Sequence, residues 1–421
     1  MSGCYILKTY LIKILTVYWK EKLRFDFIQS FQEDCPDNLK TLISEITKLK
    51  PNVNTYSEKC NPKLVHNSGL SRKKLHEIVS LAPLIDNICR QNDTDIVIDI
   101  GADLGYLSHL LHDNYKYSVL GIECSSQYIN MGYKNQNKFY PNSKGHVKFA
   151  QHYIDENSGN EIAALLEEYF PNGSQKSVCI AGLHACADLS ITILDLFSKL
   201  EFVKCLVIMP CCYHRIQLEN CTEENEYFRN FPASQLFKDM FKEFKAQCFI
   251  TRPFLRLACQ QTMEAFKNMT TEDHERHSRS CMYRAILQEV VHLENCQVKR
   301  LKRKSGKNRN SSSKEDFQTY LNNLKSTHQL EYNDTAEGEK LNIGDEEFQR
   351  KATKKWNEHK NDCYLVEVLT GLQASIQSIC ENIVLLDRVE FLKEKGFECS
   401  VQKVTDDVIS PRCYALVAFK A

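Results

Sequence analysis

A glycine-containing turn follows the first strongly apolar run of this 421-residue sequence, Ile96–Ile100. The residues around the turn read DIGADLGYLSHLL, with Asp99, Gly101 and Gly105 where a strand gives way to a helix. Such a turn directs backbone N–H groups toward a ligand, and glycine is needed where φ is positive or where the ligand lies against the main chain. The loop is therefore a candidate site for the polar end of a nucleoside cofactor.

An acidic residue, Glu123, ends the second apolar run, Tyr117–Glu123. A carboxylate at the end of the second strand can accept hydrogen bonds from both ribose hydroxyls of a nucleoside. Gln151 ends the third run, Val147–Gln151, and is expected to contact the same ligand. The alternative interpretation of Glu123 is an ordinary strand-end residue or helix cap. NAD is the alternative cofactor, but the loop lacks the GxGxxG phosphate cradle.

Two further apolar runs, Ser177–Leu183 and Lys204–Pro210, end in polar and thiol side chains. Ligands of open parallel sheets bind at the carboxyl ends of the strands, so these side chains form a second candidate surface. They are His184, Cys186, Asp188, Cys211, Cys212, Tyr213 and His214.

Three chemistries fit this second surface. His184, Tyr213 and Asp188 are candidate catalytic residues, with His184 or Tyr213 orienting or deprotonating an acceptor. The His and Cys residues could instead bind a metal, although their spacing matches no finger pattern. A nucleophilic Cys211 or Cys212 is the third possibility, and it requires a lowered thiol pKa.

The structural alternative to these roles is that the cysteines fill the core and that Asp188 caps the helix beginning at Leu189. The sequence has 19 cysteines, an odd number without regular spacing, which argues against a secreted disulfide scaffold. No CxxC pair is followed by a second pair at finger spacing, so a structural zinc finger has no support.

The elements that position both surfaces alternate short apolar runs with helix-length stretches between Ser71 and about Gln247. This alternation predicts a parallel α/β sheet of five βα units. Near the end, Asn382–Gly396 predicts an amphipathic helix that stops at glycine, and two strands joined by a short turn follow. A parallel dinucleotide-binding sheet has no reason to end in such a hairpin, whereas the class I methyltransferase sheet does. The predicted fold class is therefore α/β, a Rossmann-like class I methyltransferase sheet with a C-terminal antiparallel hairpin.

The hairpin is separated from the five βα units by more than a hundred residues, which implies an insertion into one domain. We expect an N-terminal helical extension over 1–62, the methyltransferase core over 63–250, a helical insertion over 251–375 and the final helix with its strand pair over 376–421. Within the insertion, a linker over about 297–347 is expected to be disordered because it is polar and highly charged. The basic run Lys299–Arg309 is interpreted as solvated, with an RNA-contact or nuclear-import role as the alternative.

Composition narrows the class of protein. The 54 basic and 54 acidic residues balance, which argues against binding of duplex nucleic acid by bulk charge. Lys8 and Lys13 interrupt the apolar N-terminal segment, so a signal peptide or membrane anchor is not expected. The expected location is the cytoplasm or the nucleus, without a membrane partner.

Several segments together resemble the methyltransferase-like protein 25 family, which includes proteins labelled ribosomal RNA adenine dimethylase domain-containing. They occur in family order from about Trp19 to the end, and together they are highly specific. They are SRKKLHEI (Ser71–Ile78), DIGADLGYLS, GLHACADLS, CCYHRI, FPAS (Phe231–Ser234), YRAILQ (Tyr283–Gln288), LLDRVEFL (Leu385–Leu392) and SPRCYALVAFK (Ser410–Lys420).

The resemblance implies a class I fold that uses S-adenosylmethionine (SAM) and transfers a methyl group to a poorly defined acceptor. It implies cofactor contacts at Asp99, Gly101, Gly105 and Glu123, with Lys74 and His76 over the cofactor.

The chain departs from the family at Asp103, Ala187 and Pro210, where the family usually has glycine. A carboxylate at position 103 could repel the methionine carboxylate of SAM. The strand-tip motifs also look like those of a tRNA ribose 2′-O-methyltransferase family, which by analogy makes an RNA hydroxyl a candidate acceptor. The motif after the fourth strand is not that of adenine N6 methylation.

The leading hypothesis is thus a SAM-dependent methyltransferase acting on RNA or protein. The rivals are an inactive methyltransferase-fold binding module, with Asp103 preventing cofactor binding, and a metal- or thiol-dependent protein using the strand-tip cysteines.

Overall fold

The computed structural model describes the chain from residue 41 to residue 420. Within this span, residues 42–43, 47, 50–52, 57–61, 68, 223–224, 295, 302–315 and 333–341 are not described. The predicted extension over 1–62 therefore lies largely outside the described residues.

The described chain separates into two units: residues 41–266 with 374–421, and residues 267–373. Helix α14 (Cys363–Lys393) contributes residues to both units. The predicted insertion began at 251, whereas the boundary between the units lies after residue 266. Helix α9 (Arg252–Ala258) therefore belongs to the larger unit, and α10 (Met263–Lys267) ends at the boundary. The buried side chains of Leu255 and Ala258 explain why α9 stays with the larger unit.

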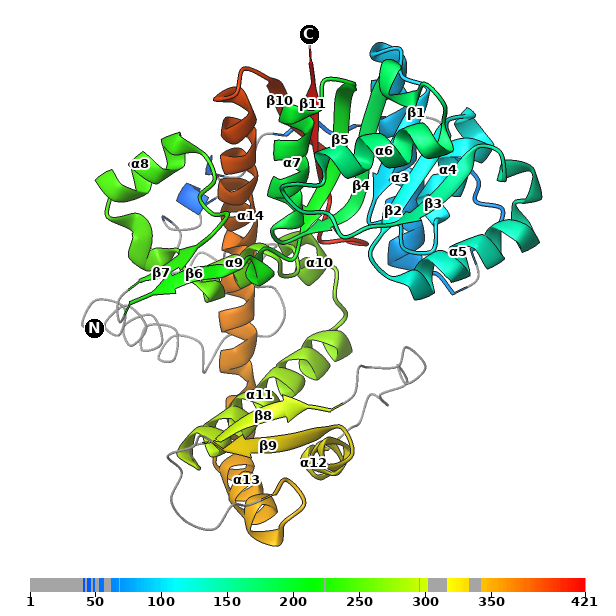
Figure 1. The fold of residues 1–421 in the computed structure, drawn as a ribbon. Coiled ribbons are helices and arrows are strands. Elements are labelled where there is room, and N and C mark those ends of the chain that lie inside the picture. The colour runs from blue at the N-terminus through cyan, green and yellow to red at the C-terminus, as the bar shows by residue number, and fades with distance from the viewer. Residues whose placement is uncertain are drawn as a thin grey trace. The chain divides into compact units, whose positions relative to one another are not determined.

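A seven-stranded sheet forms the centre of the larger unit, with strand order β10-β11-β5-β4-β1-β2-β3 (Figure 1). Strands β1 to β5 run parallel to one another, and β11 is antiparallel to both β5 and β10. This order confirms the predicted class I methyltransferase fold, including the terminal hairpin. The strands are β1 (Ile96–Ile100), β2 (Ser118–Glu123), β3 (Val147–Gln151), β4 (Val178–Cys186), β5 (Val203–Cys211), β10 (Glu398–Lys403) and β11 (Tyr414–Phe419).

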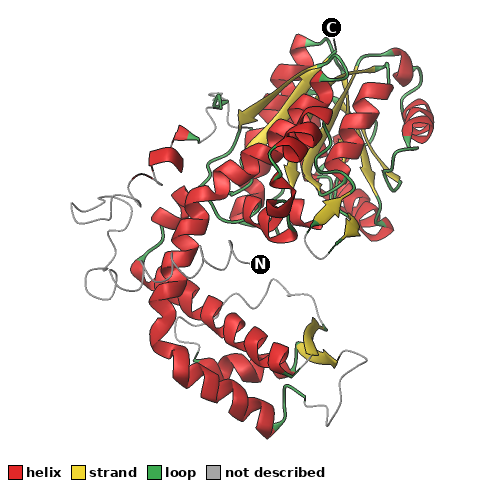
Figure 2. Cartoon of the chain, turned by 90° about the vertical axis from the view of Figure 1, so that its left-hand side faces the viewer, coloured by secondary structure: helices red, strands yellow, loops and turns green. Residues whose placement is uncertain are grey.

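Apolar residues cover both faces of the central strands, because each face packs against its own layer of helices. Every residue of β1 is buried. One core cluster joins the sheet to α3 (Arg72–Gln91), α4 (Tyr106–Tyr115) and α5 (Ser126–Phe139). The other joins it to α6 (Gly159–Tyr169), α7 (Leu189–Lys199) and the C-terminal part of α14. Figure 2 shows helices on both sides of the strands.

Two of the segments that resemble the methyltransferase-like protein 25 family, FPAS and LLDRVEFL, contact each other within the larger unit. The buried Asp387 carboxylate of LLDRVEFL accepts hydrogen bonds from the backbone N–H groups of Ala233 and Ser234 in FPAS, at 2.9–3.0 Å. Arg388 is also buried, donates to Asp387 at 2.8 Å and lies over the ring of Phe231. Both segments are therefore structural: they fix α14 to the chain leading into α8 (Gln235–Glu243).

The smaller unit contains its own apolar core. Its elements are α11 (Thr271–Leu293), β8 (Cys296–Arg300), α12 (Phe317–Lys325), β9 (His328–Tyr332) and α13 (Glu346–His359). The predicted disordered linker over 297–347 is wrong for β8, α12 and β9. Phe317, Leu321 and Leu324 lie on one face of α12 and are buried against Tyr283 and Trp356. The average polarity of the segment hid this short apolar face.

In the residues that the structure describes, no helix is long and apolar enough to cross a membrane.

The remaining described elements of the larger unit are the hairpin β6 (Leu218–Cys221) and β7 (Glu226–Phe228) and short 3-10 turns.

Candidate functional site

The turn after β1 has the left-handed backbone that its glycines predict. The φ angles of Gly101, Asp103 and Gly105 are +76°, +54° and +77°. The amides of Gly101 and Ala102 donate to the carbonyl of Ile122 in β2, and the Gly105 amide donates to the carbonyl of Ala102. These bonds hold the turn at the carboxyl end of the sheet.

The two glycines are needed for different reasons. A Cβ added to Gly105 would lie 2.4 Å from the Phe149 ring, whereas one added to Gly101 would meet nothing within 4 Å. The surface at Gly101 is therefore open to a ligand, whereas the Phe149 ring occupies the space beside Gly105.

We expect Gly105→Ala to lower the free energy of unfolding of the larger unit by about 3 kcal/mol, since overpacking adds to the left-handed strain. Gly101→Ala should cost about 1 kcal/mol, from strain alone. Chemical denaturation followed by circular dichroism checks both variants. Equal losses at the two positions would contradict this assignment of their roles.

Glu123 occupies the end of β2 beside this turn and is partly exposed. Its Oε2 accepts a hydrogen bond from the Asp103 amide at 3.2 Å, and its Oε1 accepts one from the Ser125 amide at 3.0 Å. A carboxylate offers about four acceptor positions. The Cys124 thiol, a weak donor, contacts Oε1 at 3.3 Å, so one acceptor position remains on Oε2 and a ligand hydroxyl that displaces the thiol would gain a second.

Asp103 and Lys74 form an ion pair across the turn. Lys74 Nζ lies 3.5 Å from Asp103 Oδ2, and the two side chains are 26% and 39% exposed. Asp103 adopts a positive φ that favours glycine, since few other residues adopt it without strain. The ammonium group of Lys74 lies against the carboxylate that was expected to repel the methionine carboxylate of SAM.

Asp99 lies beneath the turn and is buried. Ser108 Oγ donates to Asp99 Oδ2 at 2.6 Å. Burial raises the pKa of Asp99 from 3.8 to about 6, against the opposing effect of the Ser108 hydrogen bond. Asp99 therefore holds the first turn of α4 and does not face a ligand directly.

The raised pKa of Asp99 predicts a pH-dependent stability. The native state binds the proton more tightly than the unfolded state, so stability is lost as the pH rises from about 4 through about 6. Asp99→Asn should remove this loss, because an amide does not titrate. The variant and the native chain should have the same unfolding free energy near pH 4, and above pH 7 that of the variant should be higher by up to about 3 kcal/mol. Denaturant unfolding at a series of pH values measures the difference, and a difference that does not vary with pH would contradict the burial of a titrating carboxyl.

The two remaining predicted cofactor residues, Gln151 and His76, both hydrogen-bond to the backbone of other segments. The Gln151 side chain is exposed and donates to the Cys124 carbonyl at 3.3 Å, beside Glu123 in the register of β2 and β3. His76 Nε2 accepts from the Asp406 amide at 3.0 Å, which ties α3 to the turn between β10 and β11. Gln151 thus lies next to the predicted cofactor surface, whereas His76 is engaged by the terminal hairpin.

The tip of β4 presents a histidine paired with a buried glutamate. His184 Nε2 lies 3.0 Å from Glu77 Oε2, and Ser410 donates to Glu77 Oε1 at 2.6 Å. Glu77 is fully buried, whereas the His184 side chain is 26% exposed. Burial acts to raise the pKa of Glu77, but His184, Ser410 and Lys73 together lower it below its ordinary value. The carboxylate is therefore ionised and can orient the imidazole.

His184 also has a strained backbone, with φ at +63°. Ala187 and Cys212 are left-handed too, at +52° each. Strained residues of this kind cluster at functional sites, where the surrounding structure holds them in place. The tips of β4 and β5 fit that description.

Tyr213 and Asp188 are positioned differently from their predicted catalytic roles. Tyr213 is buried, and its hydroxyl donates to Glu381 Oε1 at 3.2 Å, so it faces the interior below α14. Asp188 lies at the start of α7 but does not cap it. Its carboxylate accepts from the Gln217 amide at 2.9 Å and from Asn230 Nδ2 at 2.7 Å. Both residues thus fasten loops, and these contacts argue against direct work on an acceptor.

A buried polar network surrounds Tyr213. Arg412 Nη1 donates to Glu381 Oε1 at 2.6 Å and to the Ala258 carbonyl at 2.7 Å, and Gln377 Nε2 donates to Glu381 Oε2 at 2.9 Å. Arg412 and Glu381 are 6% and 2% exposed. The network links α14 to the start of β11.

Three thiols lie together at the tips of β4 and β5. The Sγ atoms of Cys186, Cys211 and Cys212 all lie within 4.8 Å of one another, and those of Cys186 and Cys211 are 2.9 Å apart. Hydrogen bonding from Cys186 and Cys211, followed by the charges of Arg215 and His214, lowers the pKa of Cys212 below its ordinary value. Ionisation of the cluster is therefore favoured at Cys212, which is half-buried.

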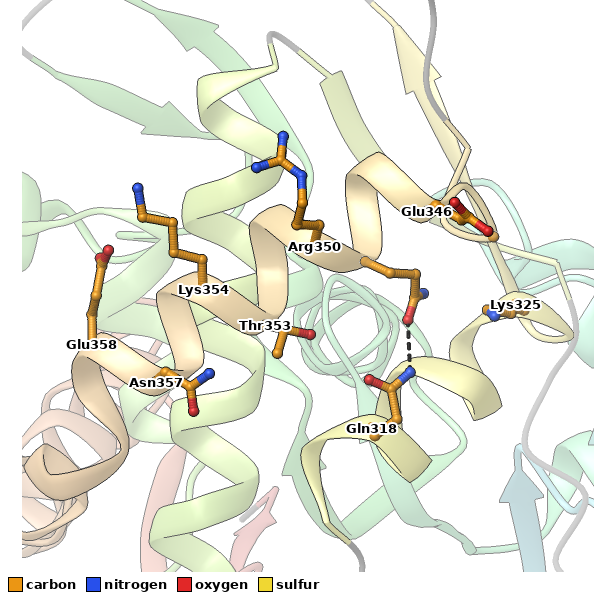
Figure 3. Close-up of a pocket in the computed structure, with 10 residues that line it drawn as sticks. Gln318, Lys325, Glu346, Arg350, Thr353, Lys354, Asn357 and Glu358 are labelled. Carbon is orange, nitrogen blue, oxygen red and sulfur yellow. Dashed lines mark hydrogen bonds between the residues drawn. The ribbon is translucent and has the colours of Figure 1, made fainter.

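An open pocket also exists in the smaller unit, between α12 and α13 (Figure 3). Its side chains are polar and mostly exposed, and include Lys325, Arg350 and Glu346. Gln318 donates to Gln349 across it at 3.0 Å. The pocket combines no nucleophile with a buried base, so the strand tips remain the better catalytic candidate.

Sequence reasoning missed Glu77, Ser410 and Glu381. Glu77 lies in the SRKKLHEI segment beside Lys74 and His76, the residues predicted to contact the cofactor, and its spatial neighbour His184 is far away in the sequence. The only available signal was that the segments containing Glu77 and Ser410 both resembled the same family.

Comparison with known proteins agrees with the fold of the larger unit. Residues 73–219 match a family described as a methyltransferase domain. The chain is 26% identical to the human protein named "Probable methyltransferase-like protein 25" over 247 residues, which are 57% of this chain and 36% of that protein. The mouse protein of the same name gives 26% identity over 250 residues, 57% of this chain and 37% of that protein. The chain thus matches little more than a third of the length of these curated relatives.

Solved structures include an RNA methyltransferase from Salinibacter ruber in complex with S-adenosyl-L-homocysteine. It is 12% identical, with a TM-score of 0.22, and the match covers 34% of this chain and 83% of that chain. At such values the match adds nothing to the sheet order described above. Taken together, residues 73–219 match a methyltransferase domain, the sheet has the strand order of a class I methyltransferase, and the chain is similar to the curated methyltransferase-like protein 25 proteins.

Proposed function

We propose that this chain is a SAM-dependent methyltransferase that binds SAM at the turn after β1 and methylates an RNA or protein acceptor at the tips of β4 and β5. The observation on which the proposal chiefly rests is the open left-handed turn at Gly101 beside the Glu123 carboxylate, within a class I methyltransferase sheet. SAM, when bound, would supply an electrophilic methyl group.

The residues present fit this cofactor. No atom would meet a Cβ at Gly101, so the backbone there is accessible. Glu123 retains acceptor capacity for ribose hydroxyls after its bonds to the Asp103 and Ser125 amides. Lys74 offers a positive charge beside the turn, where an amino-acid carboxylate would otherwise meet only Asp103.

His184 is the proposed general base. β4 pairs directly with β1, so its tip adjoins the cofactor turn. With Nε2 against the ionised Glu77, His184 can receive an acceptor proton at Nδ1, and the resulting imidazolium is stabilised by that carboxylate. General-base contributions of this kind are typically about 100-fold to 10,000-fold in rate.

Labelled-methyl transfer from SAM to fractionated RNA and protein tests the function. The native chain should label one fraction, and His184→Ala should reduce the rate by at least about 100-fold while leaving SAM affinity unchanged. His146→Ala, at an exposed histidine preceding β3, is the matched control and should keep full activity. An equal loss in both variants would argue against His184 as the base.

The rival, a binding module that has lost its cofactor, makes the opposite prediction at position 103. If Asp103 blocks the turn, Asp103→Gly should create SAM binding that the native chain lacks. The Lys74 pair favours the enzymatic interpretation, because it offsets the carboxylate in place. Titration calorimetry of both proteins with SAM separates the two, since the proposal requires binding by the native chain.

A further inference from the structure

We propose that Cys186, Cys211 and Cys212 form a zinc-binding site at the tips of β4 and β5, with His214 as the fourth ligand. The site is independent of SAM, so it can fail or succeed separately from the proposed methyl transfer.

The positions of the thiols suit a metal. Their Sγ atoms lie within 4.8 Å of one another, close to the separation of about 3.8 Å that a tetrahedral site with Zn–S bonds of about 2.3 Å requires. Cys186 and Cys211 are register partners on the paired strands, so the sheet itself holds two of the three ligands. Side-chain rotation would widen their 2.9 Å contact to the required distance.

His214 provides a second observation that points to a ligand. It follows Cys212 by two residues in the 3-10 turn Tyr213–Arg215. Its Nδ1 is buried and has no hydrogen-bond partner among the residues that the structure describes. No nitrogen of His214 is among the ligand atoms that already lie within 4.8 Å of one another, so its imidazole must turn toward the three thiols to complete the site. A buried polar atom without a partner is costly, and a bound metal would satisfy it. Cysteine and histidine are the ligands that zinc prefers.

The local charge favours this site. Zinc with three thiolates and a neutral imidazole has a net charge of −1, which needs positive neighbours. The charge of Arg215 acts on Cys186 and Cys212, and those of Arg252 and Arg256 act on His214. Arg252 also donates to the His214 carbonyl at 2.7 Å, which fixes its position.

A second group of thiols provides an internal comparison. Cys89, Cys179 and Cys205 also have Sγ atoms within 4.8 Å of one another, but all three are fully buried in the apolar core. The hydroxyl of Thr94 lies 3.9 Å from Cys205 Sγ. A charged metal site there would be surrounded by apolar side chains, because all three cysteines belong to the core cluster between the sheet and α3, α4 and α5. We therefore assign this second group to core packing.

The test uses the full-length chain, purified under reducing conditions and freed of metal with a chelator. Zinc content is measured by mass spectrometry after zinc is added and the excess removed, and Co²⁺ is added to a second sample as a spectroscopic probe. The native chain should retain one zinc per chain and give a sulfur-to-cobalt charge-transfer band. Cys212→Ser should weaken zinc affinity by at least about 100-fold, whereas Cys205→Ser, the matched variant in the core group, should retain it.

Several results would overturn the proposal. These are the absence of a thiolate–cobalt band in the native chain, zinc loss in Cys205→Ser but not in Cys212→Ser, and a Cys186–Cys211 disulfide in the protein before reduction. Unchanged zinc affinity in His214→Ala would overturn His214 as the fourth ligand.

A measurement on the native chain covers the case in which a variant does not fold. Zinc should slow alkylation of Cys186 and Cys212 by iodoacetamide without affecting the exposed Cys248. Equal protection of all three, or of none, would contradict the site.

Discussion

Glu123→Ala is expected to weaken SAM binding by about 100-fold or more. Two hydrogen bonds from ribose hydroxyls to a carboxylate contribute about 1.5–3 kcal/mol each, and the variant removes both. Titration calorimetry with SAM measures the loss. Glu168→Ala, at an exposed glutamate on α6, should bind as the native chain does.

The structure requires a second control for this result. Glu123 also accepts from the Asp103 and Ser125 amides, so its removal could loosen the turn itself. Glu123→Gln keeps an acceptor oxygen for one of these amides and should fold like the native chain by circular dichroism, yet still lose most of the affinity. Unchanged affinity in both Glu123 variants would contradict the placement of the ribose at β2.

Glu381→Ala is expected to lower the free energy of unfolding of the larger unit by about 3–5 kcal/mol. The variant leaves Arg412 buried without its carboxylate partner and also removes the acceptor of Gln377 and Tyr213. Tyr213→Phe, which removes only one hydroxyl from the same network, should cost about 1 kcal/mol.

Hydrogen exchange of peptides from β4 and β5 reports this loss directly, because these strands lie in the larger unit. We expect their exchange to accelerate strongly in Glu381→Ala and little in Tyr213→Phe. Similar exchange in the two variants would show that the network is not held by its buried charge pair.

Much of the fold followed from local patterns. The runs Ile96–Ile100 and Val147–Gln151 match β1 and β3 residue for residue, because strands buried on both faces read as continuous apolar segments. The terminal hairpin was decisive for the class of sheet. The ordered part of the smaller unit was missed, because α12 buries only a few apolar residues within a polar segment.

The candidate site was predictable only in part. Gly101 and Glu123 follow from position on strands, since the order of βα units brings them to one edge. The pairing of Glu77 with His184 depends on how α3 crosses the sheet, which no local pattern encodes. Tyr213 carried the chemistry of a catalytic residue, but its burial beneath α14 is a tertiary property.

A crystal structure of the full chain with S-adenosylhomocysteine, the product of methyl transfer from SAM, would probe the cofactor site most directly. The nucleoside should lie against the backbone of Gly101, with its ribose hydroxyls on the carboxylate of Glu123 and its amino-acid end near Lys74. A complex in which the ligand occupies another surface, or a saturated crystal in which this turn stays vacant, would contradict the account.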